Sequence, residues 1–136
     1  MIRAGISLAR LQAVCADYRS ESLICYVGDK EVARRAQELN LPRSLLAVQK
    51  AKPCLDGAIA LFGNAPVALL EMNRLIMEEN IKPALVVAMP VGFVHVLESK
   101  EEVATTGIPF ITLGGRRGGS PLAVSVIHAL CSLAGQ

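Results

Sequence analysis

Apolar residues along the chain form short continuous runs that alternate with longer stretches of helical spacing. Four runs have the length and aliphatic composition of buried strands: residues 23–27, 58–62, 84–89 and 108–113. Helices are predicted at residues 30–39, from 43 to before Pro53, from Pro66 to a stop at Asn80, 98–106 and 120–133. This order predicts an α/β fold over residues 1–136, a single domain with a mostly parallel sheet in a three-layer α/β/α arrangement.

Residues with known capping preferences mark the expected helix ends. Asp29 and Asn64 are expected N-caps, with Pro66 in the first turn of the helix that follows Asn64. Asn80 is expected to end that helix in the left-handed conformation. Ser120 is expected to cap the last helix.

The last predicted helix is apolar on nearly every side. Its apolar residues are Leu122, Ala123, Val124, Val126, Ile127, Ala129, Leu130 and Leu133. A helix with this pattern is expected to be buried on most of its surface.

Composition narrows the classes of partner. Among 136 residues, 52% are apolar and 19% are charged, and the net charge is +2 from 14 basic and 12 acidic residues. This charge is too small for nucleic-acid binding, and the apolar runs are too short to cross a membrane. The apolar surplus instead favours a partner subunit.

The four cysteines are widely spaced and form no C-x-x-C pair. They are Cys15, Cys25, Cys54 and Cys131. This spacing argues against a zinc site and a thioredoxin-like site, so no metal is expected. We expect reduced, mostly buried thiols, no signal peptide and a cytoplasmic location.

Three glycine-marked loops, at residues 63–66, 90–94 and 114–120, each follow a predicted strand and precede a predicted helix. In an open α/β sheet, such turns gather at the carboxyl ends of the strands, where ligands bind. The three loops therefore predict a single binding edge.

Two of these loops carry candidate binding residues. Arg116 and Arg117 lie among four glycines, a pattern that favours anion binding, although ligand-free turns of this kind are also common. Gly92 would let the backbone approach a ligand, and Phe93 could stack on a flat ligand or belong to the core. Asn64 in the first loop can be explained by capping, and it is also kept as a candidate substrate-binding residue.

Other candidates lie outside the glycine runs. Arg43, followed by Ser44, is a cation at a helix start, where a bound carboxylate or an ordinary surface position would explain it. His95, beside the second loop, is a weak catalytic candidate, whereas His128 is expected to be a core residue. The chain has no G-x-S-x-G, Walker or G-x-G-x-x-G motif.

Taken in series, these stretches resemble the precorrin-8X methylmutase family, including its cobalt-precorrin-8 members. The matching residues are 1–5, 9–11, Arg43 with Ser44, 63–66, 68–69, 90–94, 98–100 and 114–120. The resemblance implies a homodimeric α/β isomerase that uses no cofactor and moves a methyl group from C-11 to C-12 of a corrinoid macrocycle. It also places the family's substrate-contacting arginine at Arg43.

The chain departs from the family pattern in two places. It is expected to begin about a third of the way into that pattern, so the family's catalytic histidine has no counterpart here. A Gly-Ala-Ala stretch of the family is replaced by residues 95–97, which puts His95 where the family has none.

Three readings of the function stay open. The leading one is a methylmutase, the second a non-catalytic module that binds a corrinoid or another polyanion, and the third a structural dimeric domain. A phosphate or nucleotide binder using residues 114–120 is a weaker alternative, because no acidic metal ligand follows at a suitable spacing.

Overall fold

The structure is a computed structural model that describes residues 2–135. Its elements in chain order are α1 (Ile2–Gly5), α2 (Leu8–Val14), η1 (Ser20–Ser22), α3 (Lys30–Leu39), α4 (Arg43–Ala51), η2 (Lys52–Cys54), β1 (Ile59–Phe62), α5 (Pro66–Glu79), β2 (Leu85–Ala88), α6 (Val96–Val103), β3 (Phe110–Thr112) and α7 (Ser120–Ala134). Three of the four predicted strands are confirmed within a few residues.

The three strands form one parallel sheet in the order β1-β2-β3. Leu61 is the register partner of Val87, which in turn is the partner of Ile111. Because all three strands run the same way, their carboxyl ends lie at one edge of the sheet.

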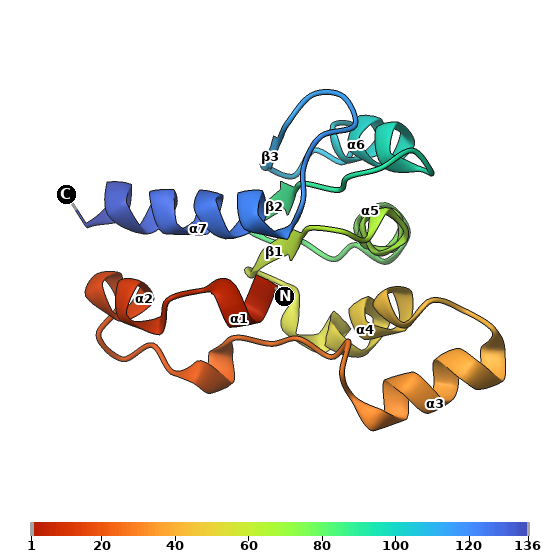
Figure 1. The fold of residues 1–136 in the computed structure, drawn as a ribbon, viewed down its shortest axis with the longest axis horizontal. Helices are drawn as coiled ribbons and strands as arrows, with labels where there is room; N and C mark the ends of the chain where they lie inside the picture. The colour runs from red at the N-terminus through yellow and green to blue at the C-terminus, as the bar shows by residue number, and fades with distance from the viewer. Residues whose placement is uncertain (1, 136) are drawn as a thin grey trace.

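Helices cover both faces of the sheet, which confirms the three-layer prediction (Figure 1). On one face, Phe62 and Val86 belong to a buried cluster with Leu69 and Met72 of α5 and Val103 of α6. On the other face, Val87 packs with Met89 and with Ala123 of α7 in a smaller cluster. The alternation of side chains along a strand sends neighbouring residues to opposite layers.

Helices α3 and α4 form a separate packed pair, as their spacing predicts. Val32 and Ala36 of α3 are buried against Leu46 and Ala47 of α4. The Asp29 side chain accepts a hydrogen bond from the Val32 N–H at 3.1 Å, which confirms it as the N-cap.

The prediction of a strand at residues 23–27 is wrong. This segment is irregular, and Ile24 and Val27 are 43% and 45% exposed. A strand needs a neighbour for its backbone N–H and C=O groups, and within residues 2–135 none pairs with this segment. Local apolar composition is therefore not enough to make it a strand.

Two predicted caps are also wrong. Ala65, not Asn64, is the N-cap of α5, and no side-chain cap bond forms there, although Pro66 does occupy the first turn. Gly119 is the N-cap of α7, and Ser120 is already helical. Gly119 takes the cap position because its N–H donates to the Met89 carbonyl at 2.6 Å with φ at 114°.

The short helix α6 begins and ends earlier than residues 98–106. At its end, the hydroxyl groups of Thr105 and Thr106 donate to the carbonyl oxygens of Glu102 and Val103 at 2.7 and 2.8 Å. Such local bonds compete with the helical pattern and favour a turn.

The expectation that α7 is buried on most sides is wrong. Only Ser120, Ala123 and Ile127 of this helix are buried, whereas Leu122 and Leu133 are 40% and 65% exposed. A helix of 15 residues is about 22 Å long, while strands of four residues span about 13 Å. The second half of α7 therefore passes beyond the sheet and lies over α2 (Figure 1).

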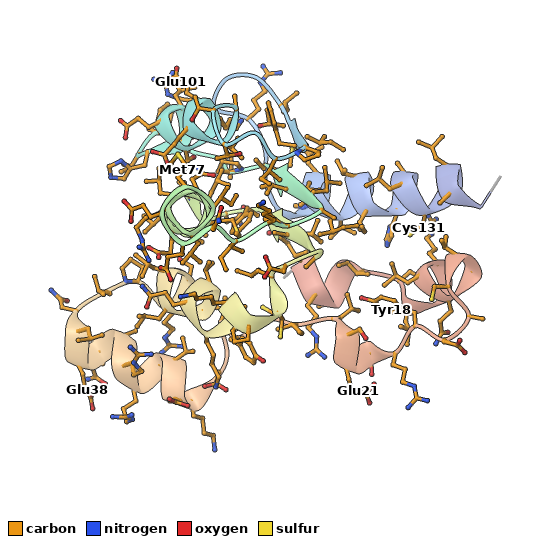
Figure 2. The ribbon with its side chains drawn as sticks, turned by 180° about the vertical axis from the view of Figure 1, so that it is seen from behind. Tyr18, Glu21, Glu38, Met77, Glu101 and Cys131 are labelled. Carbon is orange, nitrogen blue, oxygen red and sulfur yellow. The ribbon has the colours of Figure 1, made fainter. Side chains whose placement is uncertain are left out.

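The far end of α7 packs on the N-terminal segment of the chain. Figure 2 shows Cys131 of α7 above Tyr18. Burial is the main reason that the pKa of the Tyr18 hydroxyl is raised, and the nearby thiols of Cys131 and Cys15 add to it. The Nε2 atom of His128 accepts a hydrogen bond from the Ser7 N–H at 3.0 Å. This agrees with the expectation that His128 is a packed residue with a hydrogen-bond partner rather than a catalytic one.

The expectation of mostly buried thiols is wrong. Cys15, Cys25 and Cys54 are exposed, Cys131 is half-buried, and all four are free. Cys15 follows α2, Cys25 lies in the irregular segment and Cys54 ends η2, so all three precede the first strand of the sheet.

Within residues 2–135, no helix is long and apolar enough to span a bilayer.

Candidate functional site

The three glycine-marked loops meet at the carboxyl edge of the sheet. The Gly92 N–H donates to the Arg116 carbonyl at 3.2 Å, and the Gly119 N–H donates to the Met89 carbonyl at 2.6 Å. Gly63 lies against Ser120. The loop of residues 114–120 thus joins the other two into one continuous edge.

The glycines of this edge have structural causes. A Cβ on Gly118 would lie 2.6 Å from the Pro90 carbonyl oxygen, and one on Gly63 would lie 2.9 Å from the Ser120 Cα. Real Cβ atoms do not tolerate such contacts, so close packing of the loops requires glycine at both positions. The glycine pattern alone therefore does not establish an anion site.

Arg116, Arg117 and Phe93 lie on the outside of this edge. The guanidinium carbon of Arg116 is 5.8 Å from the centre of the Phe93 ring, a cation–π distance. Phe93 is 87% exposed, which excludes the core position considered for it. Neither arginine forms an ion pair within residues 2–135, so both guanidinium groups are free to bind an external anion.

His95 is the N-cap residue of α6 and has the left-handed conformation, with φ at 62°. Its Nδ1 lies 2.9 Å from Glu98 Oε2, and its side chain is 48% exposed. Glu98 thereby orients the imidazole, and Nε2 is the atom left to exchange a proton with a ligand. The pair lies two residues from Phe93, at the outer rim of the edge.

An apolar cavity of about 500 Å³ lies on the other side of the loop after β1. Its lining comes from β1, α4, α1 and the irregular segment, and it includes Tyr26, Ser44 and Asn64. Asn64 also faces Gly119, so this residue stands between the cavity and the loop edge. Ser44 lines the cavity but is not part of the loop edge.

Arg43 is not brought against Arg116 within this chain. It is exposed at the start of α4, and α5 lies between α4 and α6 (Figure 1). The predicted site residues therefore form two groups: Gly92, Phe93, Arg116 and Arg117 at the loop edge, and Arg43 and Ser44 on α4, with Asn64 between them. Their convergence on one ligand stays a prediction.

Lys100 of α6 is a residue of this region that the sequence analysis did not select as a site residue. It is 6% exposed, and its Nζ donates to the carbonyl oxygens of Leu113, Gly115 and Arg117 at 2.5, 2.7 and 2.7 Å. Burial lowers the pKa of the ammonium group, while the three acceptors favour its charged form. Its place four residues after buried Val96 is the signal that could have found it.

The neighbouring contact between α5 and α6 is also polar. Asn73 is fully buried, and its Nδ2 donates to the Ser99 carbonyl at 3.1 Å. The Ser99 hydroxyl donates to the Val96 carbonyl at 2.9 Å. These bonds hold the helix that carries Lys100 against the centre of the molecule.

Within residues 2–135, no group of three His, Cys, Asp or Glu side chains could hold a metal ion.

The parallel sheet covered by helices on both faces places the protein in the class of open α/β proteins, in which ligands bind at the carboxyl ends of the strands. The family model described as precorrin-8X methylmutase matches residues 1–133. The chain belongs to this family.

Individual relatives agree with the family match. A cobalt-precorrin-8 methylmutase of Leptospira interrogans is 42% identical over 98% of this chain and 62% of its own length. The corresponding protein of Priestia megaterium is 48% identical over 98% of this chain and 57% of its own length. The chain thus spans about three fifths of the length of these curated relatives.

A solved structure gives the same result for the fold. The precorrin-8X methylmutase of Thermus thermophilus superimposes with a TM-score of 0.80 and 38% identity, covering 98% of this chain and 62% of that one. The arrangement of helices and strands described above is therefore that of the family.

Proposed function

We propose that this chain is an isomerase of corrinoid biosynthesis, which moves a methyl group from C-11 to C-12 of precorrin-8X or cobalt-precorrin-8. The observation that carries this proposal is the similarity to methylmutases over 98% of the chain. The proposed unit is one methylmutase-like domain over residues 1–136, located in the cytoplasm. The reaction is an intramolecular rearrangement and needs no cofactor.

The loop edge offers the groups that such a substrate requires. A corrinoid intermediate is broad and flat and carries several carboxylates on its periphery. Free guanidinium groups on Arg116 and Arg117 match carboxylates, because each presents a planar fork of N–H donors. The exposed Phe93 ring offers a flat surface against which a macrocycle can stack.

Arg43, Ser44 and Asn64 form the second part of the proposed site. Because α5 separates Arg43 from Arg116, both parts can contact one molecule only if the ligand is large or if a second subunit supplies one part. We therefore include a homodimer in the proposal. The exposed apolar residues of α7, Leu122 and Leu133 among them, supply a surface for it.

His95 is the proposed, and weakest, catalytic assignment. Methyl migration on a conjugated macrocycle is assisted by a proton donor that stabilises charge in the transition state. The contact between Nδ1 and Glu98 would leave Nε2 to serve that role. His95→Ala should lower kcat with little effect on KM if the assignment holds.

The test is to incubate the protein with precorrin-8X and with cobalt-precorrin-8, and to follow the absorbance of the product. Conversion supports the isomerase. Tight binding without conversion would support the alternative of a non-catalytic corrinoid-binding module. Absence of both would overturn the proposal.

Arginine substitutions test which part of the site binds carboxylates. Arg116→Ala, Arg117→Ala and Arg43→Ala should each weaken corrinoid binding by about 1.5–3 kcal/mol, the value of a charge-assisted hydrogen bond. Arg35→Ala is the matched control, because Arg35 is exposed on α3, which carries none of the proposed site residues. An arginine whose removal leaves the Kd unchanged does not belong to the site.

A further inference from the structure

We propose that Lys100 is a positioning residue that turns the backbone of residues 113–118 into a fan of N–H donors for a ligand with several separated carboxylates. The ligand part of this inference rests on the proposed function. The arrangement of the backbone does not, because it follows from contacts within the chain.

The Lys100 ammonium group uses all of its hydrogens on one loop. An ammonium group has three N–H donors, and three carbonyl oxygens lie within hydrogen-bond distance of it. The acceptors belong to every second residue: Leu113, Gly115 and Arg117. The carbonyl of Arg116, between them, accepts the Gly92 N–H instead. The loop is thus held by Lys100 and by the second glycine loop together.

The planarity of the peptide bond sets the direction of the remaining donors. In a trans peptide, the C=O of one residue and the N–H of the next point in opposite directions, and the structure has no cis bond in this loop. With three carbonyls turned toward Lys100, the N–H groups of Gly114, Arg116 and Gly118 point away from it. None of these three N–H groups donates a hydrogen bond within residues 2–135.

The curvature of the loop distinguishes two kinds of anion. Three carbonyls that converge on one Nζ lie on the concave side of the loop, so the N–H groups diverge on its convex side. Diverging donors do not enclose a single phosphate, as the converging N–H groups of a nest do. They suit several carboxylates spaced along the rim of a larger molecule, together with the free guanidinium groups of Arg116 and Arg117.

The burial of a lysine without a carboxylate partner needs such an explanation. Lys100 forms no ion pair within the described part of the chain, and burying an ammonium group is unfavourable unless its donors are satisfied. An apolar side chain would fill the same volume without that penalty. It would not orient the three carbonyls.

The experiment compares Lys100→Met with the matched control Lys82→Met, which makes the same change at an exposed lysine. In the unliganded protein, Lys100→Met should shift or broaden the NMR amide signals of Gly114, Arg116 and Gly118 and speed their hydrogen exchange, while Lys82→Met should not. Unchanged loop signals in Lys100→Met would overturn the inference, whether or not the protein binds a corrinoid.

Ligand binding gives the second arm. Cobyrinic acid, a corrin ring with free peripheral carboxylates, should shift these three amide signals in the wild type, whereas inorganic phosphate at the same concentration should not. Its affinity should fall at least tenfold in Lys100→Met and recover in part in Lys100→Arg, which keeps a cationic donor. An equal response to phosphate would overturn the fan in favour of a single-anion site.

The outcomes separate the two proposals. If the wild type binds no corrinoid while the loop signals depend on Lys100, the proposed function fails and the positioning role stands. If corrinoid binding is intact in Lys100→Met, the positioning role fails alone. Should Lys100→Met not fold, the wild-type shifts decide, and ligand shifts confined to residues outside 113–118 would count against the inference.

Discussion

The two faces of the sheet differ in how completely their helices are buried. On the α5 and α6 face, Leu69, Met72 and Val103 are fully buried in one continuous cluster. On the α7 face, only Ala123 and Ile127 among the apolar residues of the helix are buried. Yet α7 is more apolar than either α5 or α6. Apolar content therefore shows what a helix can bury, while the width of its partner decides what it does bury.

The residues on the solvent side of the helices also differ between the two faces of the sheet. Met77 on the outer side of α5 is half exposed, and Glu101 on α6 is exposed, as expected for the solvent side of amphipathic helices (Figure 2). On α7, the exposed positions include Leu122 and Leu133 and no charged residue. An apolar outer side is typical of a surface that another protein covers.

The largest expected effect on stability comes from a substitution in the well-buried cluster between the sheet and helices α5 and α6. Leu69→Ala should lower the free energy of unfolding by about 2–5 kcal/mol, because it leaves a cavity in a fully buried cluster. The same change at Leu133, which is 65% exposed, should alter it by less than about 0.5 kcal/mol. Urea unfolding measures both, and equal losses would show that the faces do not differ.

The next effect concerns the loops that join the two faces. Gly118→Ala should lower the free energy of unfolding by about 1–3 kcal/mol, because the added Cβ would collide with the Pro90 carbonyl. Gly114→Ala is the control, since no atom lies within 4 Å of the position its Cβ would take. A tolerated Gly118→Ala would mean that the loops are not in tight contact.

A third prediction tests the partner expected on α7. Leu122→Glu combined with Leu133→Glu should weaken the proposed dimer at least tenfold, while the far-ultraviolet circular dichroism stays unchanged. Sedimentation equilibrium measures the association. A protein that is monomeric without these substitutions would remove the homodimer from the proposal and leave the apolar side of α7 unexplained.

The smallest effect lies in the pair of α3 and α4, outside both faces. A hydrogen bond from Lys50, at 2.9 Å, is the main reason that the pKa of Asp29 is lowered below 3.8, and the same contact raises the pKa of Lys50 above 10.5. A lowered carboxyl pKa stabilises the folded state above the unfolded value and ceases to do so as the pH falls through the folded value.

Asp29→Asn isolates this charge, because asparagine is also a good N-cap. The wild type should be slightly more stable than the variant at neutral pH, and the difference should shrink as the pH falls below about 4. Added salt should reduce it as well, since both side chains of the pair are partly exposed to solvent. A difference that persists at pH 2 would assign the effect to the cap rather than to the charge.

The sequence predicted what depends on neighbours along the chain. Helix α3, with Asp29 at its start and left-handed Asn40 at its end, is set by bonds over three or four residues. The strands of the sheet were also found, because each is a continuous apolar run between turn residues. Membership of the family came from the order of several short stretches rather than from any one of them.

Apart from the end of α6, which local hydrogen bonds set, the errors involve partners distant in sequence. Residues 23–27 have the composition of a strand but lack a neighbouring strand, and Asn64 lost its capping role because its loop packs against Gly119 and Ser120. Lys100 was missed for the same reason, since its acceptors lie 13, 15 and 17 residues further along the chain. The spacing of residues along the chain does not predict contacts between residues that are far apart in the sequence.

The contact between Gly63 and Ser120 also has a consequence for synthesis of the protein. The loop edge at the carboxyl ends of the strands is closed by a residue of the last helix, so it cannot assemble until most of these residues have left the ribosome. Until then, the half-finished sheet exposes its α7 face to the cell. Slow translation before residue 120 should therefore increase capture of the nascent chain by chaperones.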